Sequence, residues 1–193
     1  LLLSVNPHGE KSAIIQVLTR TKGIHAGILQ NAFSRKMSYT LQPSSQLHLN
    51  WSSRLEEHLG TYKVDLLKTR VDILLRNKLA LDIFNSLSSL CISTLAERDP
   101  MPEFYEMTIK FLDQIVSQKK WEFLYLDWEL QLLTSIGYGL DLNKCVASGS
   151  TEDLFYISPK SGKAVSKEKG FKYDKKLLRF PNILKYKKKY NDF

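Results

Sequence analysis

Basic side chains close to aromatic ones are the first candidates for chemistry in this chain of 193 residues. Such pairs suit single-stranded nucleic acid, because the cations contact phosphates while the rings stack on bases. Phe33 and Tyr39 flank two of these cations, Arg35 and Lys36, in a polar stretch. We therefore predict a nucleic-acid-binding surface that contains eight basic residues: Arg20, Lys22, Arg35, Lys36, Arg54, Lys63, Lys68 and Arg70.

Aromatic residues in this region can stack on bases or pack in a core. Trp51 alternates with Leu47 and Leu49, so we expect its ring in the core. For Phe33 and Tyr39 the sequence leaves both alternatives open. Because no base-reading helix is apparent, we expect little sequence specificity.

Residues 159–164 (PKSGKA) contain a Gly-Lys pair of the kind found in phosphate-binding loops. That motif also needs a glycine five residues before Gly162 and a hydroxyl directly after Lys163. Ile157 and Ala164 occupy these positions. We therefore expect no nucleotide site here.

Metal ligands and catalytic groups show no recognisable spacing. Cys91 and Cys145 each stand alone, whereas thiolate zinc sites use cysteine pairs two to four residues apart. The carboxylate pair Glu56-Glu57 lies in no obviously apolar pocket, and no nucleophile elbow occurs. We accordingly predict no catalytic residue, no metal and no cofactor.

Net charge is +8 and is unevenly distributed. Residues 1–72 hold nine basic and five acidic residues. Residues 73–166 hold nine basic and twelve acidic residues, and residues 167–193 hold ten basic and three acidic residues. This asymmetry favours a polyanionic partner, nucleic acid before an anionic membrane. The tail, with its cluster Lys185, Lys187, Lys188 and Lys189, lacks a clear apolar face, so we expect no membrane binding. The alternative is that these cations only keep the protein soluble.

Apolar and polar residues alternate over 24–28, 47–51 and 62–66, and residues 12–19 are rich in β-branched and apolar side chains. With residues 1–5, these segments predict five short strands separated by turn-like segments. About five short strands in 70 residues suit a small closed or partly closed barrel of the OB type. The period then changes to that of helices, which we expect over 72–96, from Pro102, and over 121–136. A short hairpin is expected over 150–166, and the segment beyond Lys167 is left open between a last helix and an arm.

Length suits one domain or two small ones. We predict an α+β chain of two domains, a basic OB-type barrel over 1–70 and a helical domain with a hairpin insertion over 71–193. Two cysteines are too few for a disulfide framework, so we expect a reducing compartment. No membrane span or secretory signal is evident. The chain begins at Leu1 rather than Met, and the sequence leaves open whether natural residues precede it.

Several strings, in order and at suitable spacing, give the chain a family resemblance. They are Pro7–Ala13 (PHGEKSA), Leu41–Pro43 (LQP), Glu97–Pro100 (ERDP), Trp128–Leu130 (WEL), Gly137–Leu142 (GYGLDL) and Ser158–Gly162 (SPKSG). In these strings the chain resembles the bacterial RecO family of DNA repair and recombination mediators, over most of its length.

This resemblance implies an N-terminal OB barrel, a helical C-terminal domain and no catalysed reaction. It implies binding of single- and double-stranded DNA, strand annealing, and action with RecR and single-strand-binding protein to load the RecA recombinase. A bacterial cytoplasmic, nucleoid-associated location follows from the same resemblance. The alternative is a non-catalytic protein–protein scaffold whose basic tail only aids solubility.

Two departures from the family pattern matter. Many members carry a four-cysteine zinc site, but here Ser148 stands at the second position, and Ser166 and Lys169 fall near the last two. With Cys145 alone we predict a hairpin at about 145–169 without zinc, held by packing of side chains such as Phe155. The basic string after the third strand is also only partly kept, in Arg35 and Lys36.

Overall fold

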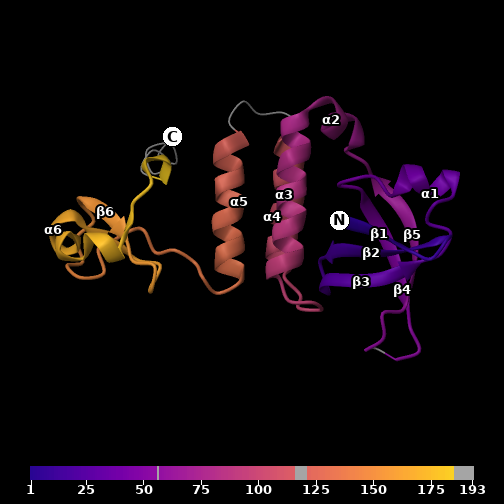
Figure 1. Cartoon of the computed structure of the whole chain (residues 1–193), viewed down its shortest axis with the longest axis horizontal. Coiled ribbons are helices and arrows are strands. Elements are labelled where there is room, and N and C mark those ends of the chain that lie inside the picture. Colours follow the sequence, from indigo (N-terminus) through magenta and orange to yellow (C-terminus); the bar gives the residue numbers. More distant parts are fainter. Residues whose placement is uncertain (56, 116–120, 185–193) are drawn as a thin grey trace. The chain divides into compact units, whose positions relative to one another are not determined.

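A computed structural model of the chain describes residues 1–55, 57–115 and 121–184 (Figure 1). The chain folds into two compact units, Leu1–Trp128 and Glu129–Phe193. We call these unit 1 and unit 2 and describe each by itself. The predicted Lys cluster of the tail, at 185–189, lies outside the described residues.

Five strands form the sheet of unit 1, where the sequence predicted them. They are β1 (Leu2–His8), β2 (Ser12–Thr19), β3 (Gly23–Leu29), β4 (Gln46–Ser52) and β5 (Thr61–Lys68). The strand order is β1-β2-β3-β5-β4. Neighbours are antiparallel except β3 and β5, which pair in parallel.

The two edge strands of this sheet, β1 and β4, do not pair as a ladder in the described residues. One backbone hydrogen bond, from Leu2 N to Ser45 O (2.8 Å), links their beginnings. The β-sheet region followed by helices confirms the predicted α+β layout, whereas the sheet is open rather than a closed barrel.

Alternation buries one face of the strands. Ala13, Ile15 and Val17 of β2 are fully buried, because side chains two apart point to the same side of a strand. Trp51 of β4 lies opposite Tyr62 of β5 and packs against the same core cluster. Trp51 itself is only partly buried, so its ring packs at the edge of this core rather than within it, and the prediction holds in part.

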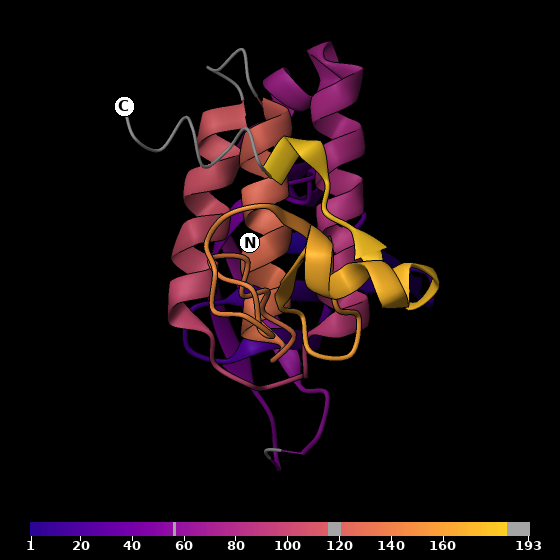
Figure 2. The same cartoon turned by 90° about the vertical axis from the view of Figure 1, so that its left-hand side faces the viewer.

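A short helix, α2 (Val71–Arg76), and three long ones follow the sheet: α3 (Lys78–Thr94), α4 (Pro102–Ile115) and α5 (Trp121–Ser135). In Figure 2 the long helices stand roughly parallel to one another. The helices predicted from Pro102 and over 121–136 are confirmed.

The single helix predicted over 72–96 is wrong, because Asn77 divides it. Asn77 has extended backbone angles, and its side-chain oxygen accepts hydrogen bonds from the N–H groups of Leu79 (3.1 Å) and Ala80 (3.3 Å). Asparagine is a strongly preferred N-cap residue. The sequence signal was present, but the continuous apolar pattern concealed it.

Trp128 joins α4 to the first half of α5 in unit 1. Its ring is 1% exposed and lies against the rings of Phe104 and Phe111. Its Nε1–H donates to Thr108 Oγ1 (2.9 Å). The only polar atom of this large side chain is thus satisfied, which allows its burial without a desolvation cost.

Arg70 joins the sheet to α4. Its side chain is nearly buried, and its guanidinium lies 2.7 Å from Asp113 Oδ1. It also donates to Ser44 O (3.1 Å) and Gln46 Oε1 (3.3 Å), next to the start of β4. One planar cation therefore ties together the exit of β5, the entry to β4 and a helix.

Unit 2 contains the hairpin predicted over 150–166. β6 (Leu154–Ile157) pairs antiparallel with β7 (Ala164–Ser166) and, on its other side, with β8 (Leu178–Arg179). Between β7 and β8 lie α6 (Lys167–Gly170) and the 3-10 helix η1 (Phe171–Lys176). As far as it is described, the segment beyond Lys167 thus forms α6, η1 and β8 and turns helical again over 182–184.

The predicted domain boundary between residues 70 and 71 stays a prediction. The two compact units divide later, at residue 128, because α3 contacts β1 and α4 contacts β2 within unit 1. In the part of the chain that the structure describes, no helix has the length and apolar character needed to cross a membrane.

We expect Arg70→Ala to lower the free energy of unfolding by about 3 kcal/mol, because it leaves Asp113 and Ser44 O without their buried partner. Lys68→Ala is the control: Lys68 also contacts Asp113 (2.8 Å) but is half exposed, so its loss should be below about 1 kcal/mol. Urea unfolding of the two variants measures both. Equal losses would contradict the role of Arg70.

The effect of Arg70→Ala should depend on pH. Partial burial alone would raise the pKa of Asp113, but hydrogen bonds from Arg70 and Lys68 outweigh it and hold that pKa below 3.8. A carboxyl with a depressed folded-state pKa adds stability above its unfolded value, and this is lost as the pH falls through the folded value. The difference between parent and variant should therefore shrink from pH 7 to pH 3.

Candidate nucleic-acid interface

The connection from β3 to β4 carries the short helix α1 (Arg35–Thr40). The Ser34 hydroxyl accepts a hydrogen bond from Met37 N (3.4 Å) and begins the helix, as serine commonly does. The buried Ala32 anchors the connection, since its N–H donates to Lys11 O (2.9 Å). The sequence thus fixes both the start of α1 and its attachment to the sheet.

Among the side chains that these anchors leave on the surface are two aromatic and two cationic ones: Phe33, Tyr39, Arg35 and Lys36. Phe33 is 50% exposed and Tyr39 is 63% exposed. The two aromatic residues whose role the sequence left open therefore lie beside the two predicted cations. We call these four residues, together with exposed Lys11, the α1 patch.

The α1 patch belongs to an acid-free stretch of the chain. From Lys11 to Leu55 there are six Lys or Arg residues and no Asp or Glu. Without carboxylates nearby in sequence, the positive potential of these cations is not locally offset. Lys11 was not among the predicted residues, although it is the first basic residue of this acid-free stretch and could have been identified from it.

Arg20 and Lys22 lie together at the turn from β2 to β3. They line a hollow of about 510 Å³ with Trp51 and Tyr105 among its walls. The Lys22 ammonium lies 4.8 Å from the centre of the Trp51 ring, whereas Arg20 pairs with Glu106 (3.1 Å). Glu106 offsets the charge of Arg20, so Lys22 is the stronger candidate for a phosphate contact.

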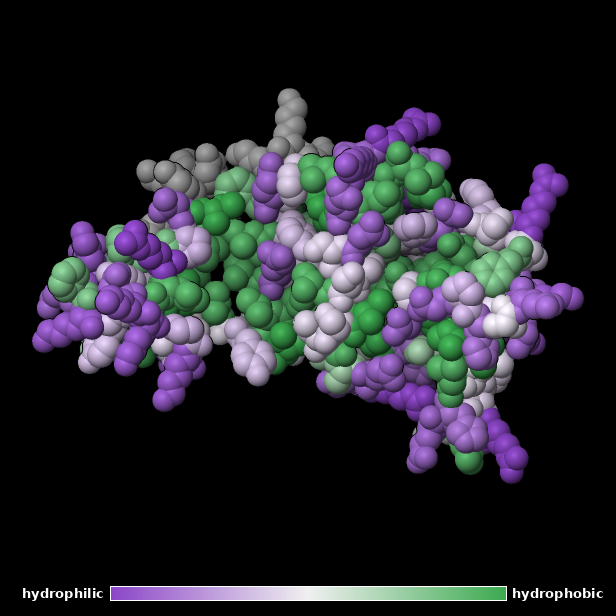
Figure 3. Space-filling view, viewed as in Figure 1, coloured by the Kyte–Doolittle hydropathy of each residue, from purple (hydrophilic) through white to green (hydrophobic). Residues whose placement is uncertain are grey.

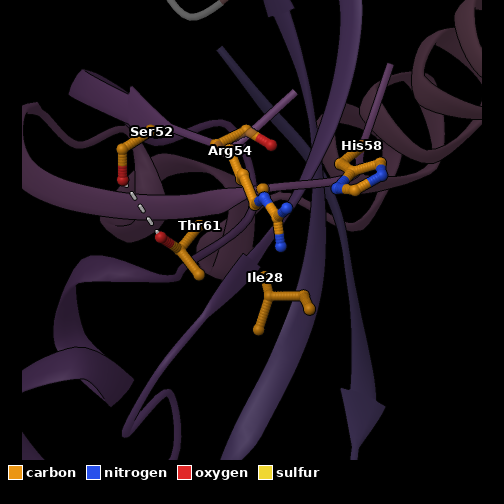
Figure 4. Close-up of a pocket in the computed structure, with 7 residues that line it drawn as sticks. Ile28, Ser52, Arg54, His58 and Thr61 are labelled. Atoms are coloured by element: carbon orange, nitrogen blue, oxygen red, sulfur yellow. Dashed lines mark hydrogen bonds between the residues drawn. The ribbon is translucent and has the colours of Figure 1, made fainter. Parts of the chain in front are cut away.

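Arg54 lies in the loop from β4 to β5 and lines a second hollow, of about 400 Å³. In Figure 4 its side chain extends toward Ile28, and His58, which also lines the hollow, lies to one side of it. A hydrogen bond between the hydroxyls of Ser52 and Thr61 (3.2 Å) closes the base of the loop. Arg54 is thus a cation at the rim of a concave surface.

Trp51 and Arg98 fix the path of this loop. Trp51 Nε1–H donates to Leu59 O (3.0 Å), and Arg98 donates to His58 O (2.9 Å). The Arg98 guanidinium also lies over the Trp51 ring, 5.7 Å from its centre. Gly60 passes the ring with φ +64, where a Cβ would lie 2.5 Å from Trp51 Nε1. Glycine is required here by both conformation and space.

A buried pair, His25 and Tyr62, supports Trp51 from the sheet. The Tyr62 hydroxyl and His25 Nδ1 are hydrogen-bonded, and the His25 ring meets the Trp51 ring edge to face at 5.1 Å. Burial first, and then the charges of Arg98 and Lys22, lower the pKa of His25 below 6.5. His25 is accordingly neutral at pH 7, and the positive charge at this site comes from Lys22 and Arg98.

The last three predicted residues are placed differently from one another. Lys63 is exposed on the outer side of β5, opposite Asn50. Lys68 is half exposed and pairs with Asp113. Arg70 is 4% exposed and its guanidinium is engaged within the protein, which gives it a structural role, and its contact with DNA stays a prediction.

The structure therefore distributes the predicted cations over separate places in unit 1. The α1 patch combines exposed cations with exposed aromatic rings, which is the chemistry that binds phosphates and stacks bases. The described residues contain no group of three or more His, Cys, Asp or Glu side chains placed to hold a metal ion.

Family models match both parts of the chain. One, described as "Recombination protein O N terminal", covers residues 1–70, and "Recombination protein O C terminal" covers residues 80–191. The chain belongs to the RecO family. This membership supports a role in DNA repair and recombination.

Curated relatives agree with the RecO assignment. The chain is 45% identical to "DNA repair protein RecO" of Ruegeria sp. (strain TM1040), over 96% of this chain and 77% of the relative. It is 41% identical to the protein of that name from Dinoroseobacter shibae, over 95% and 76%. It is 40% identical to the protein of the same name from Roseobacter denitrificans, over 96% of this chain and 77% of the relative.

The zinc site that the RecO resemblance implies does not fit the donors present. Of the four positions only that of Cys145 holds a thiol, and Ser148, Ser166 and Lys169 occupy or lie near the other three. Lys169 pairs with Glu168 (2.9 Å). Structural zinc takes four donors drawn from thiolates and imidazoles, so this set does not suit it.

Hydrogen bonds surround the Cys145 sulfur instead. Ser166 N–H donates to it (3.2 Å), and the sulfur lies 3.5 Å from Ser166 Oγ. Burial would raise the pKa of Cys145, but hydrogen bonds from Ser148 and Ser166 outweigh it and lower the pKa to about 6. Cys145 is 1% exposed and packs with Tyr156 and Val165. The sulfur is thus the polar centre of the small core of unit 2.

We expect Cys145→Ala to destabilise unit 2 by about 1–3 kcal/mol, because Ser166 N–H loses its buried acceptor. Cys145→Ser, which keeps an acceptor, should cost less. Calorimetry of both variants and of the parent, each before and after dialysis against EDTA, measures these effects. The parent should unfold at the same temperature with and without EDTA; a lowered midpoint, or one zinc per chain by elemental analysis, would contradict this assignment.

Proposed function

We propose that this RecO-family chain binds single- and double-stranded DNA without strong sequence specificity and accelerates annealing of complementary strands. In this role it acts as a mediator of recombinational repair that helps load recombinase on coated single strands. The observation that carries the proposal is the α1 patch, where exposed cations and exposed rings meet in an acid-free stretch.

The sheet of unit 1 is, in this proposal, an OB-type fold. Three features support it: the strand order, the parallel pairing of β3 with β5, and the Leu2–Ser45 hydrogen bond between the edge strands. OB-type folds commonly bind single strands on their sheet and the adjoining loops. The α1 connection and the β4–β5 loop, with Arg54, are such loops.

The proposed mechanism is electrostatic. Two DNA strands repel each other through their phosphates, and cations placed between them reduce that repulsion. Arg35, Lys36, Lys11 and Lys22 supply these charges, while Phe33 and Tyr39 stack on unpaired bases. No chemical step is required, and we propose that the protein is not an enzyme.

The partners we propose are RecR, single-strand-binding protein and, indirectly, the RecA recombinase. The family membership supports these partners, and the DNA-repair names of the relatives fit a bacterial cytoplasmic protein near the nucleoid. The helical segments carry the partner contacts in this proposal.

Replacing Arg35 and Lys36 together with Ala should lower affinity for any single strand by about tenfold at low salt, because two phosphate contacts are lost. The plot of log K against log salt should become shallower by about 1.4. Fluorescence anisotropy over a salt series measures both quantities.

Arg76→Ala with Lys78→Ala is the matched control, since it removes two exposed cations from the junction of α2 and α3. Equal losses in the two double variants would show that only net charge matters and would remove the α1 patch from the proposal.

The function itself is tested by annealing of two complementary fluorescent oligonucleotides, with and without a coat of single-strand-binding protein. We expect acceleration that fades with salt, because bound phosphates release counterions, and that survives the coat. A folded chain that neither binds nor anneals DNA would contradict the proposal and favour the scaffold alternative.

A further inference from the structure

Unit 2 carries a second concentration of positive charge that the proposed function has not used. Residues 160–179 contain eight basic and two acidic residues. The basic ones are Lys160, Lys163, Lys167, Lys169, Lys172, Lys175, Lys176 and Arg179. On the face shown in Figure 3, hydrophilic side chains project from this unit with apolar atoms visible between them.

Both acidic residues of this segment have partners inside the unit. Glu168 pairs with Lys169 at 2.9 Å. Asp174 is hydrogen-bonded to the Tyr156 hydroxyl, and burial together with this carboxylate raises the pKa of Tyr156. The remaining cations include Lys172, Lys175 and Lys176, for which no ion pair occurs among the described residues. Their charge is therefore available to an external anion.

Exposed aromatic rings lie within the same segment. Phe171 is 74% exposed and Tyr173 is 58% exposed. Gly170 explains their position: it is buried against the Tyr156 ring, where a Cβ would lie 2.3 Å from the ring. The close approach of Gly170 fixes the turn between α6 and η1 and leaves Phe171 and Tyr173 directed to solvent.

Unit 2 also contains a hollow of about 420 Å³, lined by Phe155, Arg179, Phe180, Pro181 and Asn182. The Lys167 ammonium lies 5.5 Å from the centre of the Phe155 ring, and Phe180 N–H donates to Phe155 O (2.8 Å). Aromatic walls with Arg179 at the rim offer a stacking surface next to a phosphate contact.

We propose that this basic-aromatic surface of unit 2 binds a second single DNA strand, so that the two strands to be paired are held on different units. This inference rests on the proposed annealing function. Seven of the eight cations are lysines, a residue depleted at protein–protein interfaces, and the interleaved rings suit bases. A polyphosphate chain therefore fits this surface better than a protein partner.

The test uses the full chain and three multiple variants. Lys172→Ala, Lys175→Ala and Lys176→Ala together remove the cations, and Phe171→Ala with Tyr173→Ala removes the rings. The matched control replaces three exposed cations of unit 1, Arg76, Lys78 and Lys110, with Ala. All these side chains are exposed, and circular dichroism melting verifies that each variant folds.

Two readouts separate the first strand from the second. Anisotropy with one labelled oligonucleotide gives affinity for a first strand, and energy transfer between two labelled, non-complementary oligonucleotides reports capture of a second. Both unit 2 variants should keep first-strand affinity within about threefold but lose energy transfer and anneal about tenfold more slowly. The control variant should keep energy transfer between the two oligonucleotides, and its annealing rate should stay within about threefold of the parent's.

Other results overturn the inference in distinguishable ways. Unchanged energy transfer and annealing in the unit 2 variants would remove the second site and leave the proposed function standing. If the parent chain neither binds nor anneals DNA, both the second site and the proposed annealing function are overturned. Loss of binding to an acidic, aromatic-containing peptide, with strand capture unchanged, would assign this surface to a protein partner.

Discussion

The contact between Arg70 and Asp113 holds unit 1 in its arrangement. Arg70 follows β5, and its planar group reaches the start of β4 through Ser44 O and Gln46 while binding a carboxylate of α4. A guanidinium can do this because its five donors point in fixed directions. The nearly buried charge needs all its partners, since an unpaired charge at that depth would cost several kcal/mol, on the order of 3–5. The positions of β4, β5 and α4 are therefore set together, and the α1 connection and the β4–β5 loop start from these strands.

Local features of the fold could be predicted from the sequence, and non-local ones could not. Alternation and the content of β-branched and apolar residues located all five strands of unit 1, because both depend only on neighbours in the chain. The parallel pairing of β3 with β5 joins residues more than thirty positions apart, such as Ile28 and Thr61, and no local pattern specifies it. Arg70 shows the same limit at one residue: its type and spacing match a phosphate contact, and only Asp113, 43 residues later, gives it a structural role. Asn77 was readable in principle, as a preferred cap inside an apolar stretch.

In the candidate interface, too, residue types could be predicted from the sequence, whereas the contacts that place them could not. Arg35 and Lys36 were identified from their residue types, and the structure adds that Phe33 and Tyr39 share their surface. Lys11 was missed because it belongs to a different turn, which one backbone hydrogen bond to Ala32 connects to α1. In unit 2 the abundance of lysines was evident in the sequence, but the direction of Phe171 and Tyr173 depends on the packing of Gly170 against Tyr156. Contacts of this kind arise only when the chain has folded.

The sulfur-centred hydrogen bonds of Cys145 bear on how the chain matures during synthesis. A hairpin clamped by zinc must acquire its ion before it is stable, so its yield follows the supply of free metal. Here the donors to the sulfur, Ser148 and Ser166, are part of the polypeptide itself. The hairpin can close once Ser166 has emerged from the ribosome, without competing for a scarce nutrient.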